Sequence, residues 1–145
     1  MTSIRALNTC FSKQERVYYE DTDAGGVVYH ANYLNFMERC RCDWLDSLGF
    51  NVATLQQEQD TMFVVREANL TFDAPARLFD RLTVTAQALQ VGKVKLVVEQ
   101  KIYTQGQLLC RGVVTLAALN KSSFQLTRFP EPLRHALLSE YKQTQ

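Results

Sequence analysis

Acidic side chains and glycines gather in one short segment, residues 18–33, which reads as a loop leading into a helix. It holds the carboxylates of Glu20, Asp21 and Asp23, followed by Gly25 and Gly26. Glycines let a backbone approach a ligand closely, and the first turn of a helix offers free N–H groups at a positive dipole end. Such a site can polarise a carbonyl oxygen, and a carboxylate beside it can attack the carbonyl or activate a water. The segment therefore has the groups needed to hydrolyse an activated acyl compound.

The position of each carboxylate indicates which one acts. Asp23 is the closest to the glycines, whereas Glu20 and Asp21 belong to the end of a strand and the start of the loop. We therefore expect Asp23 to be the catalytic group. The alternative interpretation is that Asp21 and Asp23 only cap a turn, as aspartate commonly does.

A metal site is not expected in this segment or elsewhere. Asp21, Asp23 and Gly26 match positions 1, 3 and 6 of a calcium-binding EF-hand loop. Position 5 is Gly25 and position 12 is Asn32, so the required side-chain oxygen and the bidentate glutamate are missing. The four cysteines and two histidines do not fall at zinc-ligand spacings. The sequence therefore implies no metal and no cofactor.

A long amphipathic helix is predicted directly after the loop. Its apolar positions recur at spacings of three and four, at Tyr33, Phe36, Met37, Cys40, Trp44 and Leu48. Gly49 follows the last of them, where glycine readily adopts the left-handed conformation that ends a helix. A short strand over residues 14–20 is expected before the loop, and a shorter helix over residues 52–58 after the long one.

The second half of the chain changes to an alternating apolar and polar pattern, which is typical of strands. Strands are predicted over residues 62–72, 81–88, 94–102 and 110–118, with hairpin turns at Gly92-Lys93 and Gln105-Gly106. Two prolines around residue 131 introduce a C-terminal helix. One long helix and four long antiparallel strands predict the α+β class, with the sheet wrapped around the helix. Residues 1–145 are expected to form a single domain.

The strand faces that point away from the helix also carry apolar side chains. We assign Val97, Tyr103, Leu109 and Val113 to these outer faces. Because a solvent-facing strand surface is normally polar, a second subunit is expected to cover part of the sheet. The protein is therefore predicted to be a homo-oligomer.

Composition and charge exclude several classes of protein. Sixteen basic and fifteen acidic residues give a net charge of +1 without a block of like charges, so a nucleic acid is not an expected partner. No apolar run approaches the ~20 residues of a membrane span. Residues 1–11 lack the apolar stretch of a signal peptide, and the cysteines read as free thiols of a reducing compartment. These features predict a cytoplasmic protein.

Residues 17–33, the helix segment 36–39 and the later Ala-Pro-Ala-Arg-Leu at 74–78 resemble the hotdog-fold thioesterases. This group includes 4-hydroxybenzoyl-CoA thioesterase, and the resemblance is strongest to its Tol/Pal-associated acyl-CoA thioesterases of YbgC type. It extends over residues 16–120, most of the chain. The resemblance implies a hotdog fold and hydrolysis of acyl-CoA, with a short-chain or aromatic acyl group, to the free acid and CoA.

The resemblance also implies roles for particular residues. The catalytic aspartate of the family falls on Asp23, in agreement with the choice made from the residues themselves. The family's oxyanion contact, a backbone N–H at the start of the helix, matches His30 or its neighbour Tyr29. The imidazole of His30 is expected either to orient the substrate or to pack as a partly buried histidine, and both interpretations stay open.

The family assembles as a dimer with joined sheets, and each site lies between subunits. Residues 62–66 of the partner subunit, Val64 among them, would then line the pocket, and a tetramer built from two dimers is expected. Arg77, Lys93 and Lys95 are candidates for binding the CoA phosphates, and the favoured alternative for each is a solvated surface cation.

Two other classes of function remain open. The chain could bind acyl-CoA or an acyl-carrier protein without turnover, as an interaction protein of the Tol/Pal envelope system or of phospholipid synthesis. A hotdog dehydratase is a further alternative, but such enzymes need a histidine paired with a separate acid, and His30 has no obvious distant partner in the sequence. Release of free thiol from an acyl-CoA distinguishes the enzyme from the binding protein.

Overall fold

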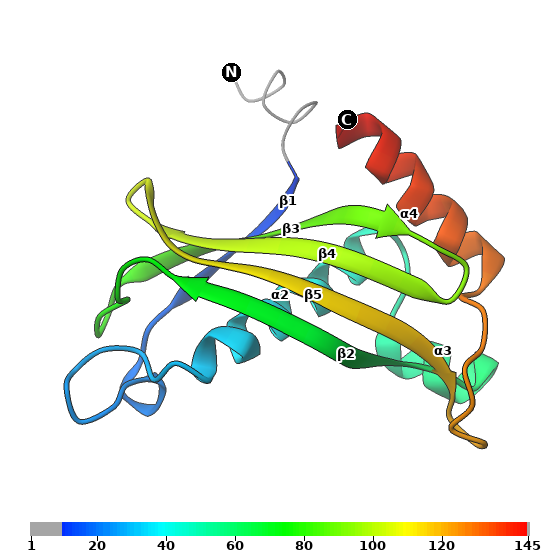
Figure 1. Cartoon of the computed structure of the whole chain (residues 1–145), viewed down its shortest axis with the longest axis horizontal. Helices are drawn as coiled ribbons and strands as arrows, with labels where there is room; N and C mark the ends of the chain where they lie inside the picture. The colour runs from blue at the N-terminus through cyan, green and yellow to red at the C-terminus, as the bar shows by residue number, and fades with distance from the viewer. Residues whose placement is uncertain (1–9, 145) are drawn as a thin grey trace.

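A five-stranded antiparallel sheet, wrapped around one long helix, forms the body of the protein (Figure 1). The structure, a computed structural model, describes residues 10–144. The strands are β1 (Phe11–Arg16), β2 (Thr61–Phe72), β3 (Arg81–Val91), β4 (Lys95–Thr104) and β5 (Gln107–Asn120), and the sheet order is β1-β3-β4-β5-β2. The helices are η1 (Tyr19–Asp21, a single 3-10 turn), α2 (Asn32–Ser47), α3 (Val52–Gln59) and α4 (Glu131–Thr144). The predicted α+β class and the sheet wrapped around the helix are confirmed.

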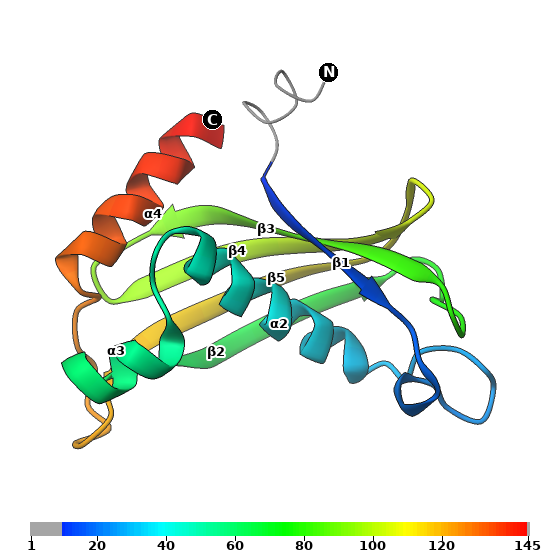
Figure 2. The same cartoon turned by 180° about the vertical axis from the view of Figure 1, so that it is seen from behind.

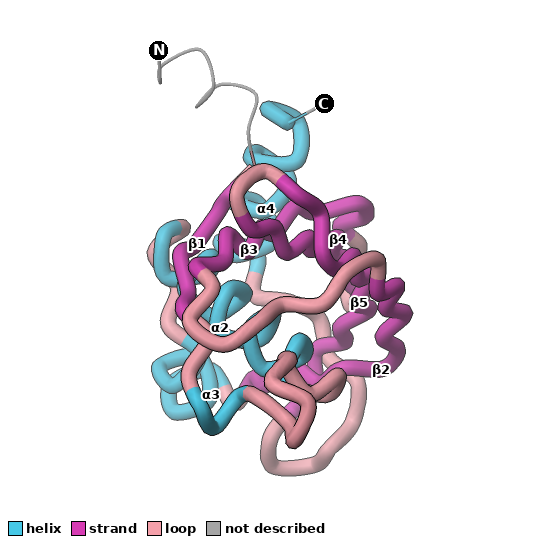
Figure 3. Tube along the Cα trace, turned by 90° about the vertical axis from the view of Figure 1, so that its left-hand side faces the viewer, coloured by secondary structure: helices cyan, strands magenta, loops and turns pink. Residues whose placement is uncertain are grey.

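Helix α2 forms where the apolar stripe predicted it, and its buried face packs against the concave side of the sheet (Figure 2, Figure 3). The side chains of Phe36, Met37, Cys40 and Trp44 are all 1% exposed or less. Burying a side chain of this size contributes about 1.5–3 kcal/mol, so this stripe is a main source of the stability that fixes α2. Gly49 has a φ of 94°, the left-handed conformation expected at the end of the helix.

A buried glutamine joins α2 to the sheet. Gln100 on β4 is fully buried, and its Nε2 donates to the carbonyl oxygen of Met37 at 3.0 Å. Its Oε1 accepts from a guanidinium nitrogen of Arg41 at 2.9 Å. Because both ends of the amide are hydrogen-bonded, the polar group costs little to bury and fixes how α2 sits on the strands.

The predicted turns are also confirmed. Gln105 and Gly106 have φ values of 48° and 80°, the pair of left-handed conformations that a tight two-residue hairpin requires. At the other hairpin the N–H of Gly92 donates to the carbonyl of Lys95 at 2.8 Å. Helix α3 matches the predicted short helix, and Asn51 caps it by accepting from the N–H of Thr54 at 3.1 Å.

Two predictions about strands are wrong. The first strand ends at Arg16 and does not extend over residues 14–20, because Tyr19 turns into η1. Leu109 was assigned to the outer face of the sheet but is 1% exposed. The pairing register of β4 and β5 shifts between Ile102 and Tyr103, and this irregularity re-aims Leu109 into the interior.

The prediction that concerned residues 1–11 falls almost wholly outside the described part of the chain. Within residues 10–144, none of the helices has the length and apolar character needed to traverse a lipid bilayer.

Candidate functional site

The acidic loop, the start of α2 and the connection between β2 and β3 lie at one end of the molecule (Figure 1, Figure 2). Backbone hydrogen bonds join the three segments. The N–H of Val28 donates to the carbonyl of Ala76 at 2.9 Å, and Val27 forms an isolated antiparallel bridge with Arg77. Local sequence thus builds the loop, while long-range pairing fixes it beside residues 73–80.

Asp21 has a structural role in the loop. Its side chain is 8% exposed, and its Oδ2 accepts from the N–H of Tyr18 at 2.9 Å, which closes the 3-10 turn. Its carbonyl oxygen accepts from the N–H of Tyr29 and from the Nδ2 of Asn32, each at 2.9 Å. For Asp21 the capping interpretation therefore holds.

Asp23 is exposed, and only one of its two carboxylate oxygens accepts a hydrogen bond from the protein within the described residues. Its Oδ1 accepts from the N–H of Gly25 at 2.8 Å, while Oδ2 has no hydrogen-bond partner within residues 10–144. A Cβ added at Gly25 would lie 3.3 Å from that Oδ1, so a larger residue there would crowd the carboxylate. Gly26 has a φ of 80°, which favours glycine at the tip of the loop. The glycines therefore orient a carboxylate that keeps one oxygen available.

Hydrogen bonding before α2 distinguishes the two backbone N–H groups that are candidates for the oxyanion contact. The N–H of Tyr29 is already donated to Asp21, whereas the N–H of His30 finds no acceptor in the described part of the chain. The rings of Tyr29 and His30 lie against each other, with centroids 4.4 Å apart. Both side chains are exposed.

A hollow opens between the start of α2 and the end of β2. It is lined by Val28, His30, Tyr33, Phe72, Asp73, Ala74 and Pro75. The rings of Tyr33 and Phe72 form one wall, with centroids 5.3 Å apart and an edge-on geometry. The Oη of Tyr33 accepts from the N–H of Ala76 at 3.1 Å, and burial raises the pKa of this phenol. Tyr33 thereby ties the connection between β2 and β3 to the helix.

Asp73 is a carboxylate of this hollow that sequence reasoning missed, and Asp23 is not among the residues lining it. Asp73 is exposed, and its N–H donates to the carbonyl of Leu109 at 2.8 Å. The available signal was its place directly after a strand, but its proximity to His30 follows only from the fold.

The structure does not bring all of the expected substrate contacts to this end of one subunit. Arg77 is there and is exposed. Lys93 and Lys95 lie at the turn between β3 and β4, at the other end of the sheet (Figure 1). Val64 lies in the first third of β2 and pairs with Ala117, far along the strand from Phe72.

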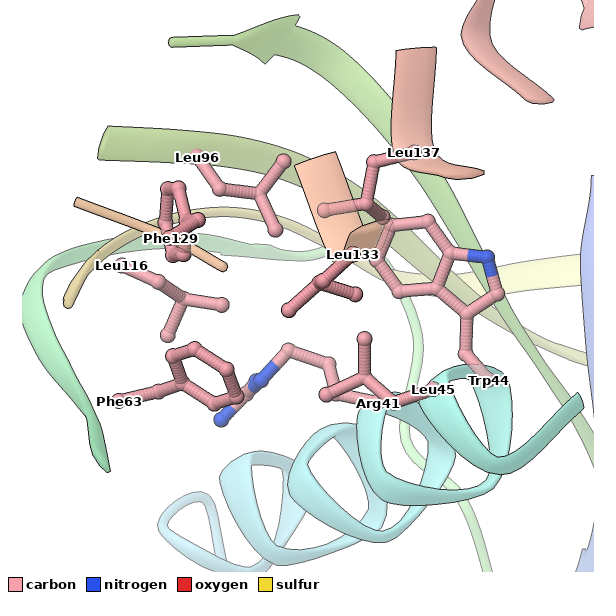
Figure 4. Close-up of a pocket in the computed structure, with 9 residues that line it drawn as sticks. All are labelled: Arg41, Trp44, Leu45, Phe63, Leu96, Leu116, Phe129, Leu133 and Leu137. Carbon is pink, nitrogen blue, oxygen red and sulfur yellow. The ribbon is translucent and has the colours of Figure 1, made fainter. Parts of the chain in front are cut away.

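A separate apolar cavity lies under α4, at the C-terminal half of α2 (Figure 4). Its lining residues are Arg41, Trp44, Leu45, Phe63, Leu96, Leu116, Phe129, Leu133 and Leu137. A second hollow beside it shares Arg41, Leu45, Phe63 and Leu116. The cavity of Figure 4 is almost completely filled by its lining side chains, and no carboxylate or nucleophile of the described residues lines it, so it belongs to the core packing between α2 and α4.

Within the described residues, no three His, Cys, Asp or Glu side chains are placed together where they could hold a metal ion. The loop itself presents the carboxylate of Asp23 and the N–H of His30, which is free within residues 10–144.

Fold and site define a thioesterase of the hotdog class, and comparison with known proteins gives the same result. The family model described as the thioesterase superfamily matches residues 25–111, so the chain belongs to this family. The predicted fold and the predicted enzyme class, a thioester hydrolase, are thereby confirmed.

Individual relatives cover nearly the whole chain. The acyl-CoA thioesterase YbgC of Haemophilus influenzae is 38% identical over 130 residues, which is 90% of this chain and 96% of that protein. A crystal structure described as a probable thioesterase from Bartonella henselae is 34% identical, with a TM-score of 0.81 over 84% of this chain and all of that one. A 1,4-dihydroxy-2-naphthoyl-CoA thioesterase from Synechocystis is 25% identical, with a TM-score of 0.82, and the match covers 90% of this chain and 96% of that one.

Proposed function

We propose that this enzyme hydrolyses acyl-CoA thioesters to the free acid and CoA, with Asp23 as general base or nucleophile. The observation that carries the proposal is the carboxylate of Asp23, which the N–H of Gly25 orients while its Oδ2 stays free. A carboxylate with an available oxygen can attack a thioester carbonyl or take a proton from water. The likeness to named acyl-CoA thioesterases supports the choice of substrate class.

The N–H of His30 is the group that we assign to the carbonyl oxygen. It lies two residues before the first residue of α2 and has no acceptor within residues 10–144, whereas the N–H of Tyr29 is occupied. A free N–H close to the positive end of a helix stabilises negative charge that develops on the oxygen as the carbonyl is attacked. Tyr29 then contributes through its ring, which supports the imidazole of His30.

For the acyl group we propose a short chain or an aromatic ring. The wall formed by Tyr33 and Phe72 offers flat apolar surfaces beside His30. Aromatic pairs favour edge-on and offset-stacked contacts, so this wall suits an aromatic acyl ring. The aromatic acyl group in the name of the relative from Synechocystis supports this choice.

We further propose that the working unit is a dimer joined through β2, with two dimers forming a tetramer. Strand β2 is 12 residues long and lies at the edge of the sheet, and it leaves Val65 50% and Phe72 49% exposed. Such an edge is a template for pairing with another strand. A two-fold axis would place the Thr61 end of one β2 beside the Phe72 end of the other, which would bring Val64 of the partner to the hollow.

Light scattering tests the assembly. The expected mass is a multiple of 16.6 kDa, and Val65→Lys should lower it, whereas Val94→Lys at the β3–β4 turn should leave it unchanged. A fully active species of monomer mass across dilution would contradict both the dimer and the shared site.

The free thiols of Cys10, Cys40, Cys42 and Cys110 support a place in the cytoplasm, where thiols stay reduced. We also propose a link to the Tol/Pal system and delivery of the acyl group by an acyl-carrier protein.

Thiol release tests the function directly. A panel of short-chain, aromatic and long-chain acyl-CoA substrates is incubated with the protein and a thiol reagent. Turnover of at least one short or aromatic substrate is expected. If CoA thioesters bind but no thiol is released from any of them, the protein is an acyl-CoA or acyl-carrier-protein binding protein, and the proposed hydrolase activity is refuted.

A further inference from the structure

Three exposed aromatic rings and a half-buried arginine form a cluster at the end of the molecule that carries the acidic loop. Tyr18, Tyr19 and Phe79 are 51%, 76% and 50% exposed. The guanidinium carbon of Arg16 lies 5.6 Å from the centroid of the Tyr18 ring and 5.1 Å from that of Phe79. Tyr19 meets Phe79 edge-on, with centroids 6.2 Å apart. These four residues are called the aromatic platform below.

Core packing does not explain why Phe79 stands where it does. Its φ is 68°, a left-handed conformation that a bulky side chain rarely adopts, and half of its surface faces solvent. Backbone hydrogen bonds hold this conformation. The N–H of Phe79 donates to the carbonyl oxygen of Val17, and the N–H of Val17 donates to the carbonyl oxygen of Asp80, each at 2.9 Å. A strained backbone that presents an apolar ring to solvent indicates a binding role.

The platform and its neighbourhood carry positive charges that form no ion pairs in the described part of the chain. Arg16 and Arg81 lie directly opposite each other in the pairing of β1 with β3, an arrangement that disfavours the folded strands unless an anion lies between them. Within residues 10–144, neither of them nor Arg77 forms an ion pair, and the Nε of Arg16 is buried without a hydrogen-bond partner. The neighbouring carboxylate of Asp80 accepts from the backbone N–H of Arg77 and leaves the guanidinium groups free.

We propose that the aromatic platform binds the adenine nucleotide of CoA, with a ring stacked on the base and with Arg16, Arg77 and Arg81 on its phosphates. Flat rings beside guanidinium groups suit a phosphorylated heteroaromatic base, because the base stacks and each phosphate accepts paired N–H bonds. The proposal rests on the proposed function and adds a binding site for the nucleotide of CoA, which lies outside the hollow that receives the acyl group.

The distances along the chain agree with this assignment. Pro75 lines the hollow, and Phe79 follows four residues later, so at most about 14 Å of backbone separates them. In CoA the long pantetheine arm separates the thioester from the nucleotide. One molecule can therefore place its thioester at His30 and its adenine on the platform.

Kinetics with two matched substrates test the assignment. The first is the best acyl-CoA of the panel, and the second is the same acyl group on pantetheine, which lacks the nucleotide. Phe79→Asn keeps a residue that tolerates a positive φ and removes the ring. Arg16→Met keeps the length and removes the charge. Phe124→Asn is the matched control, because Phe124 is also exposed, at 69%, with a φ of 60°.

We expect Phe79→Asn and Arg16→Met each to raise KM for acyl-CoA by about tenfold, because stacking of a base on an aromatic ring and a hydrogen bond to a charged phosphate each contribute about this much. The kcat on acyl-CoA and both constants on acyl-pantetheine should stay unchanged, as should the control. Unchanged KM for acyl-CoA would overturn the assignment, as would an equal loss on both substrates. The same acyl group on an acyl-carrier protein serves as a third substrate, and a loss confined to it would also overturn the assignment and make the platform a protein-docking surface. Failure of the wild-type protein to hydrolyse either thioester would instead refute the proposed function.

Discussion

The hydroxyl of Tyr33 should hold the connection between β2 and β3 against α2, and Tyr33→Phe removes this hydroxyl alone. Tyr33 is 3% exposed, and its Oη accepts from the N–H of the fully buried Ala76 at 3.1 Å. The substituted ring keeps its contact with Phe72, so little cavity forms. The cost is that of leaving a buried N–H without an acceptor, about 1–3 kcal/mol. We therefore expect the free energy of unfolding to fall by that amount.

Urea unfolding at equal protomer concentration measures the change, because the stability of an oligomer depends on concentration. Tyr19→Phe is the matched control: it removes the same atom from a side chain that is 76% exposed, and it should change stability by less than about 0.5 kcal/mol. If Tyr33→Phe costs no more than Tyr19→Phe, the N–H of Ala76 has another acceptor, and the hydroxyl does not position the connection.

Two further predictions concern buried titratable groups. Burial raises the pKa of the Glu140 carboxyl above its ordinary 4.5, although the hydrogen bond from the Nε1 of Trp44 at 2.5 Å lowers it in part. The contribution of Glu140 to stability is then fully present below the ordinary pKa of 4.5 and is lost as the pH rises through the pKa of the folded state. Glu140→Gln should therefore reduce the fall of the calorimetric Tm over this pH range. An unchanged dependence of Tm on pH would refute the prediction. Burial also raises the pKa of the Cys40 and Cys110 thiols to about 12 each, so at pH 8 iodoacetamide should label the exposed Cys42 before either, as peptide mass spectrometry would show. Equal labelling of Cys40 and Cys42 would contradict it.

The parts of the fold that depend on local pattern could be predicted from the sequence. The stripe of α2 has the helical period over four turns, and Gly49 marks its end, so its position and buried face follow from the residues alone. The Gln105-Gly106 turn was equally predictable, since Gly106 lies between two alternating segments and readily adopts the positive φ that a tight hairpin requires. Leu109 was not, because a single-residue irregularity in strand pairing reverses the face of a side chain without leaving a mark in the alternation.

The candidate site was predictable where its residues adjoin in sequence. The loop with Asp23 and its glycines is continuous, so its chemistry could be read directly. Asp73 reaches the hollow only because β2 ends beside the start of α2, a contact between distant segments. The N–H of Tyr29 is occupied through a hydrogen bond across the loop to the carbonyl of Asp21, and the order of residues does not show which N–H of the loop is taken up in this way. Lys93 and Lys95 were expected at the site but lie at the other end of the sheet of the same subunit. Their positive charge does not reveal at which end of the sheet their turn lies.

Turnover of Asp23→Asn tests the central claim most directly. The substitution keeps the size and leaves an oxygen that can still accept from the N–H of Gly25, but it removes the charge that a base or nucleophile requires. Asp73→Asn, in the hollow, and Asp21→Asn, in the turn, are the comparison variants. We expect kcat of Asp23→Asn to fall at least about a hundredfold with little change in KM or Tm, and both comparison variants to fall far less. A folded Asp23→Asn variant that keeps more than about a tenth of normal turnover, or a collapse in Asp73→Asn instead, would contradict the assignment.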